Sequence, residues 1–301
     1  MSITGSVTGE ATRDAVDHGE VGTVGEYRLL TMLLGTVTGV AVAASSWELK
    51  ASETENNKWL IFVLVAGLLG AAAGEAFGFG LNRWREVKRY HRIRLWRVWL
   101  SISVMLLLAA GLITSARYVF GETENLTWRG VALAALAIGG GLSSAATLAA
   151  IRQVTADPLP GSPGQQLNAI LRLRQMSSRM LSQLGVLILL IIAVNVAGAS
   201  WGRFKQDPNV GIFSGVVASF VIATIYVPTA SALRRRGSIF VEQNFSLADV
   251  STAELVGKAE ERQKLEKMLG LDQTTFGELK AGFVVLTPIV VAFLASFLKT
   301  D

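Results

Sequence analysis

The stretch WLIFVLVAGLLGAAAGEAFGFGLN, residues 59–82, decides the fold of this chain. It contains a single charged residue, Glu75, and it is longer than the roughly 20 apolar residues that a helix needs to cross a bilayer. The core of a soluble protein rarely requires an unbroken apolar run of this length. Residues 59–82 therefore predict a membrane-spanning helix.

Six further stretches have the same character and carry no charged residue: 29–47, 98–116, 130–151, 180–202, 210–233 and 281–298. Tryptophan, which prefers the headgroup boundary, occurs only at or just outside the ends of such stretches. Its positions are Trp47, Trp59, Trp84, Trp96, Trp99, Trp128 and Trp201. We expect an all-α polytopic membrane bundle of about seven transmembrane helices. If the last stretch only lies in the interface, the count becomes six.

Composition supports a membrane protein and excludes several kinds of site. The chain has 301 residues, of which 51% are hydrophobic and 17% charged, and its mean hydropathy is +0.44. It has no cysteine, so disulfides and thiol chemistry are excluded. The two histidines, His18 and His91, lie far apart in polar segments, so we expect no metal site and no cofactor.

The positive charges predict the orientation. Of the 28 Lys and Arg residues, 21 fall in the N-terminal tail and alternate connections, and 7 in the other set. The richer side is expected to be cytoplasmic, so the net charge of +5 reflects topology and not nucleic-acid binding. The Ala-, Gly- and Arg-rich composition suggests a bacterial plasma membrane.

These assignments divide the chain into four parts. Residues 1–28 are expected to be a flexible cytoplasmic tail, and residues 29–233 a membrane domain of six transmembrane helices. Residues 234–280 are expected to form a small cytoplasmic helical segment, and residues 281–301 a last transmembrane helix with a short tail. The helices outside the membrane are thus expected to be short cytoplasmic extensions.

Glu75 is the most informative residue inside the expected spans. It lies eight residues before Arg83, about 12 Å from the expected boundary. A carboxylate at that depth must pair with a cation, face a water-filled cavity or carry a proton. It can line a path for ions or protons. Alternatively, it can bind a neighbouring helix or a cytoplasmic arginine and only stabilise the bundle.

Glycines flank Glu75 at helical spacing, at Gly67, Gly70, Gly74 and Gly78. Small residues at this interval let another helix approach closely, so this face is expected to look into the bundle. Other polar side chains could share a polar path or bridge helices: Asn195, Ser143, Ser144 and Thr147. Pro228 and Pro288 each remove a backbone hydrogen bond within a span and predict kinks.

Two segments outside the spans could bind partners. Residues 83–97 carry Arg83, Arg85, Lys88, Arg89, Arg92, Arg94 and Arg97, which could bind anionic lipid headgroups or only fix topology. A helix is also expected from Gln165 through the fifth span to about Trp201. It carries an apolar stripe of Ile170, Leu173, Met176 and Met180, which is expected to pack against the chain's own cytoplasmic segment, a second copy or another protein.

No motif fixes a reaction. We expect a non-enzymatic membrane protein whose cytoplasmic helices bind a partner or a second copy and signal to the membrane bundle. The alternative is an ion channel or transporter in which Glu75 lines a polar path.

Overall fold

The computed structural model describes residues 11–47, 53–88, 93–120, 128–199, 209–245 and 254–272. Within these ranges the chain forms α-helices and no strand, which confirms the all-α fold. In chain order the helices are α1 (Ala11–Ala44), α2 (Glu53–Lys88), α3 (Leu95–Phe120), α4 (Trp128–Ala156), α5 (Pro163–Ala199), α6 (Asn209–Asn244) and α7 (Leu255–Met268).

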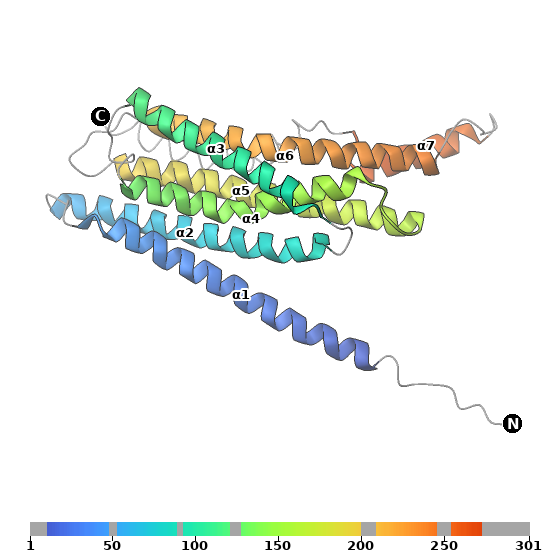
Figure 1. Ribbon diagram of the computed structural model, residues 1–301, viewed down its shortest axis with the longest axis horizontal. Coiled ribbons are helices and arrows are strands. Elements are labelled where there is room, and N and C mark those ends of the chain that lie inside the picture. Colours follow the sequence, from blue (N-terminus) through green and yellow to red (C-terminus); the bar gives the residue numbers. More distant parts are fainter. Residues whose placement is uncertain are drawn as a thin grey trace.

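The long helices lie side by side in one elongated bundle (Figure 1). Helices α2, α4, α5 and α6 form its centre, and α1 and α3 flank it. The short helix α7 lies at one end, together with the C-terminal ends of α2, α4 and α6 and the N-terminal ends of α3 and α5 (Figure 1). We call this the α7 end of the bundle.

Six of the described helices, α1 to α6, are long and apolar enough to cross a membrane. The expected seventh stretch, 281–298 with Pro288, lies outside the described residues. Large apolar side chains also cover the outside of the bundle: Leu64 of α2 is 66% exposed and Leu107 of α3 is 72% exposed. A bundle that is apolar both inside and outside is suited to a bilayer, where its outer surface contacts lipid.

The helices continue beyond the apolar stretches that predict them. Helix α2 runs on to Lys88, α4 to Ala156 and α6 to Asn244, so Arg234, Arg235 and Arg236 lie within α6 and do not begin a separate segment. Helix α1 already begins at Ala11, inside the segment expected to be a flexible tail. Helix α5 has 37 residues, a length of about 55 Å against a hydrocarbon thickness of about 30 Å.

The central helices bury two large hydrophobic cores, one after the other along the bundle, in addition to a small cluster of Met105, Ala145 and Val221. The first, the membrane core, includes Ala66, Leu69 and Ala73 of α2, Leu148 of α4, Met180 and Leu184 of α5 and Tyr226 of α6. The second, the α7-end core, includes Val87 of α2, Ile151 and Val154 of α4, Leu173 and Met176 of α5, Leu233 and Phe240 of α6 and Leu265 and Leu269 of α7. Four helices contribute to both cores, so the two parts are joined by continuous helices.

Candidate functional site

Helices α1 and α2 are in backbone contact along a glycine face. A Cβ atom added at Gly70 would overlap the backbone of Gly35, and one added at Gly74 would overlap the carbonyl of Thr31. On α1, Gly39 packs against the carbonyl of Ala66 in the same way. Small residues therefore set the distance between the two helices. The glycines predicted to admit a neighbouring helix face α1, with Gly67 against Val40 and Gly78 against Thr31.

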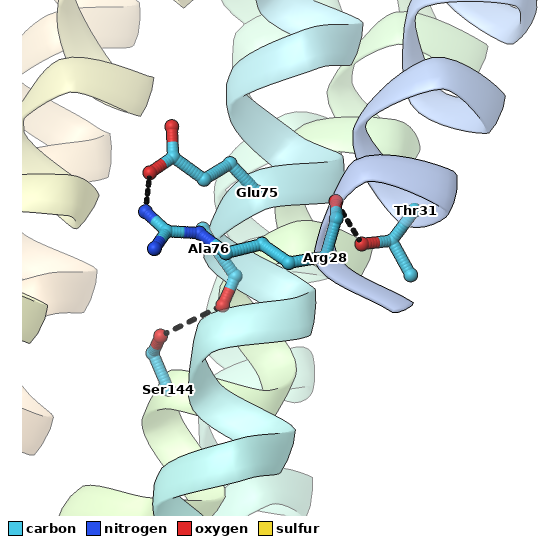
Figure 2. A network of polar contacts seen from close by, with 5 residues as sticks. All are labelled: Arg28, Thr31, Glu75, Ala76 and Ser144. Atoms are coloured by element: carbon cyan, nitrogen blue, oxygen red, sulfur yellow. Dashed lines mark hydrogen bonds and ion pairs between the residues drawn. The ribbon is translucent and has the colours of Figure 1, made fainter. Parts of the chain in front are cut away.

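Glu75 forms an ion pair with Arg28 of α1. Figure 2 shows the arginine side chain reaching from α1 to α2, where one guanidinium nitrogen meets the carboxylate. The pair lies on the outside of the described bundle, since the two side chains are 49% and 39% exposed. Arg28 directly precedes the apolar part of α1, so it neutralises a carboxylate that would otherwise be unpaired near the lipid.

The helix pairing gives a second reference point for the position of Glu75. Gly78 packs against the backbone of Arg28, the last charged residue before the apolar stretch of α1. Glu75 is three residues from Gly78, about 5 Å along the axis, whereas we expected about 12 Å from Arg83. Along the helix axis the carboxylate is thus nearer the level of Arg28 than that of Arg83.

A strip of charges continues from this pair toward the α7 end. The Cζ atoms of Arg28 and Arg83 lie 5.9 Å and 5.1 Å from the centroid of the Phe79 ring, within cation–π range. Arg83 also pairs with Glu86 at 2.5 Å, and Glu86 pairs with Arg172 of α5. We call Arg28, Glu75, Phe79, Arg83, Glu86 and Arg172 the charged strip.

The three hydroxyl residues proposed for a polar path hold α4 against α2. Ser143 donates to the carbonyl of Phe77 at 2.9 Å, Thr147 to that of Gly80 at 3.0 Å, and Ser144 to that of Ala76 at 3.5 Å. All three are buried. Figure 2 shows Ser144 directed at the Ala76 carbonyl, whereas Glu75 is directed to Arg28. Each hydroxyl donates to a backbone carbonyl of α2, a contact that supports the packing of α4 on α2.

The remaining polar and proline candidates are dispersed. Asn195 is half-buried in α5, far along the helix from the charged strip. Pro228 lies within α6, where the next residue, Thr229, donates its hydroxyl to Leu148 of α4 at 3.1 Å. This hydrogen bond joins α6 to α4 next to Pro228, which has no backbone N–H to donate.

The apolar stripe of α5 is covered by the chain itself. Ile170, Leu173, Met176 and Met180 are all buried, and the first three belong to the α7-end core with side chains of α4, α6 and α7. The stripe is therefore not a free docking face. Of the three partners expected for it, the chain itself, a second copy or another protein, it packs against the chain itself. Its apolar periodicity indicated a contact without identifying the partner.

Two arginines hold the C-terminus of α7. Arg234 of α6 donates to the carbonyl of Leu271 at 2.6 Å, and Arg174 of α5 donates to that of Gly270 at 3.4 Å. Gly270 ends α7 with φ 57°, a left-handed conformation that glycine adopts readily. Cations at a helix C-terminus also complement its dipole. We call this contact the α7 clamp.

A cavity of about 20 Å³ lies beside the α7 clamp, lined in part by Arg174, Ser177, Arg234 and Gly270. It is large enough for a water molecule and too small for an organic substrate. Across the described residues, no group of three or more His, Asp or Glu side chains could hold a metal ion. The α7 clamp and this cavity together form a small polar contact at the α7 end.

The basic residues of 83–97 have different surroundings. Arg83 belongs to the charged strip, whereas Arg85, Lys88, Arg94 and Arg97 are exposed. The backbone of Arg94 is held by Gln153 of α4, whose Oε1 accepts from its N–H at 3.1 Å. Arg89 and Arg92 lie outside the described residues.

Sequence reasoning missed Arg28, Arg172, Arg174 and Arg234 as individual partners. Only Arg28 carried a usable signal, because it directly precedes an apolar stretch.

In comparisons with known proteins, the chain matches no protein-family model, no curated protein and no solved structure.

Proposed function

We propose that this chain is a non-enzymatic multi-pass membrane protein that binds a protein partner or a second copy at its α7 end and transmits that contact to the membrane bundle. The observation that carries the proposal is the continuity of α2, α4, α5 and α6 from the membrane core into the α7-end core. Close-packed helices transmit displacement, because interiors deform little.

Cross-helix contacts support this coupling. Glu86 near the C-terminal end of α2 is paired with Arg172 of α5, and Thr229 of α6 is bonded to α4. A partner that moves the ends of α5 or α6 would therefore act on the helices of the membrane core as well. We place the α7 end in the cytoplasm of a bacterial plasma membrane, on the basis of the 21 to 7 distribution of Lys and Arg.

The contact surface in this proposal is α7, because the stripe on α5 is buried. Helix α7 docks through Leu265 and Leu269, whereas Val256 and Met268 are 68% and 63% exposed. Exposed apolar side chains on a helix outside the membrane are suited to a protein contact.

The test compares α7 variants in membranes and in detergent. Val256→Asp and Met268→Asp should abolish the cross-linked complex and reduce the particle mass to that of one 32.2 kDa chain with its detergent. Gln263→Asp, on an already polar exposed position of α7, should leave the complex intact. Equal behaviour of all three variants, or a wild-type chain that is solitary in native membranes, would contradict the proposal.

The geometry gives less support to ion permeation. Glu75 is paired with Arg28, and the three hydroxyls proposed to share its path are bonded to carbonyls of α2. A polar path needs side chains that are free to replace the hydration shell of an ion.

A further inference from the structure

We propose that the charged strip binds the phosphate of an anionic membrane lipid, with Arg28 and Arg83 as the phosphate ligands. The strip combines residues of two helices that are far apart in sequence, and it lies where a lipid headgroup would lie. This inference is independent of the partner proposed for α7.

The level of the strip follows from the pairing of α1 and α2. Trp47 and Trp59 meet at one end of the two helices, with ring centroids 4.7 Å apart. At the other end, Gly78 packs against Arg28. On α2, Gly78 is nineteen residues after Trp59, which is about 28 Å of helix. This length matches the roughly 30 Å hydrocarbon layer, so its boundary falls at Arg28 and Gly78.

The next residues of α2 then lie in the headgroup layer. Phe79 is one residue beyond Gly78 and Arg83 is five, about 2 Å and 8 Å past the boundary. The exposed Tyr27, next to Arg28, is at the same level, where amphipathic rings are favoured. Lipid phosphates occupy this layer, since headgroups add several ångström on each side of the hydrocarbon.

The strip also has the charge and geometry for a phosphate. Its three arginines face two glutamates, and Glu86 is shared between Arg83 and Arg172, which leaves one net positive charge. Arg28 is half-exposed, so its guanidinium can accept a further partner from the lipid side. Both guanidiniums lie within cation–π range of the same Phe79 ring. Guanidinium forks match phosphate oxygens, and a headgroup with net negative charge satisfies the excess charge.

This site differs from the basic segment 83–97. Exposed Arg85, Lys88 and Arg97 attract any anionic surface through screened charge, whereas the guanidiniums of the strip are fixed by ion pairs and by contacts with the Phe79 ring. Binding at the strip should therefore be saturable and should depend on individual arginines.

The first experiment measures binding of phosphatidylglycerol to the full chain in nanodiscs of phosphatidylcholine, by the rise in melting temperature as phosphatidylglycerol is added. The double variant Arg28→Gln/Glu75→Gln removes a ligand without leaving an unpaired carboxylate, and Arg83→Gln removes the other ligand. Each should weaken the apparent affinity about tenfold, the effect of one lost charge-assisted contact. Arg235→Gln, at an exposed arginine of α6, should change it less than twofold.

Equal weakening in all variants would overturn the proposal, because it would indicate diffuse attraction to the membrane. The same stabilisation from inorganic phosphate in pure phosphatidylcholine would also overturn it, because the ligand would then not be a lipid.

A second experiment needs no variant and covers the case in which an arginine variant fails to fold. Wild-type protein in membranes containing a headgroup-photoreactive phosphatidylglycerol is irradiated, digested and analysed for labelled peptides. Labels should concentrate on peptides around Arg28 and Phe79. Labels spread evenly over all helices at the α7 end would contradict the site.

Discussion

The ion pair between Arg28 and Glu75 joins two helices at the edge of the apolar zone. Both side chains are partly exposed, so the energy of the pair is modest, of the order of 0.5–2 kcal/mol for an interaction of this kind in a membrane protein. Loss of one partner has a different cost, because it leaves a single charge next to lipid.

This asymmetry gives a prediction for a double-mutant cycle. Glu75→Gln and Arg28→Gln should each destabilise the folded chain by about 1–2 kcal/mol, and the double variant should cost less than the sum of the two. Reversible unfolding in mixed micelles measures the three values. Strictly additive losses would show that the two side chains do not interact.

Ion flux supplies a second prediction at the same residue. Because Glu75 is neutralised by Arg28, Glu75→Gln should leave the conductance of reconstituted vesicles at the level of empty vesicles, as for the wild type. A wild-type flux that Glu75→Gln abolishes, with folding intact, would favour the channel alternative.

The sequence indicated that Glu75 needs a partner, because an isolated carboxylate between apolar residues is costly. It could not identify Arg28, because the partner depends on the register of α1 against α2. It also could not separate path-lining hydroxyls from packing hydroxyls. In the sequence, a serine or threonine that lines a path cannot be told from one that packs a helix. The contacts of Ser143 and Thr147 become evident only in the structure, where their hydroxyls donate to the carbonyls of Phe77 and Gly80.

At the scale of elements, the pairing of α1 with α2 depends on glycine. Gly70 and Gly74 leave no space for a methyl group, because the backbone of α1 occupies it. The stripe was recognisable in the sequence by its spacing, whereas its partners Gly35 and Gly39 became evident only from the contact.

A glycine pair tests this contact. Gly70→Ala should destabilise the chain by about 1–3 kcal/mol, because the added methyl group forces α1 away from α2. Gly139→Ala in α4 is the matched control, since nothing lies within 4 Å of its added Cβ. It should be neutral or stabilising by up to about 1 kcal/mol, because alanine favours a helix. Similar losses in both variants would mean that the α1–α2 contact is not tight.

The α7 clamp yields a further element-scale prediction. Arg234→Ala removes the hydrogen bond to the Leu271 carbonyl, so amide exchange in 255–270 should accelerate several-fold while the membrane helices stay protected. Arg235→Ala, at an exposed neighbour, should leave exchange unchanged. Unchanged exchange in Arg234→Ala would show that the clamp does not hold α7.

Hydropathy located the ends of the helices less well than any other feature of them. The apolar stretches end near residues 82, 151 and 233, yet α2, α4 and α6 run on to Lys88, Ala156 and Asn244. A change from apolar to charged residues marks a change of solvent and does not end a helix, because Arg, Lys and Glu are good helix formers. Helix α5 was anticipated closely, because the prolines and glycines of 158–164 mark its start.

At the scale of the whole molecule, two cores in series distinguish this bundle from a simple membrane domain. The α7-end core is built from the ends of four long helices and closed by α7, so this end of the chain has no fold separate from the bundle. Six of the stretches that the sequence indicated are helices long and apolar enough to cross a membrane, because apolar length is a direct signature of a bilayer. It could not show the second core, because that core depends on which long helices are neighbours.

The most direct test of the whole account is labelling of single cysteines, for which the cysteine-free chain is suited. Leu64→Cys and Leu107→Cys place thiols at outward-facing apolar positions of α2 and α3, and Gln263→Cys places one on α7. The reagent is a water-soluble maleimide, added to membrane fragments whose bilayer is intact and whose two faces are both accessible. Gln263→Cys should react readily, whereas Leu64→Cys and Leu107→Cys should react only after the protein is denatured. Rapid labelling of Leu64→Cys and Leu107→Cys in intact bilayers would contradict the account, because the apolar surface of the bundle would then face water.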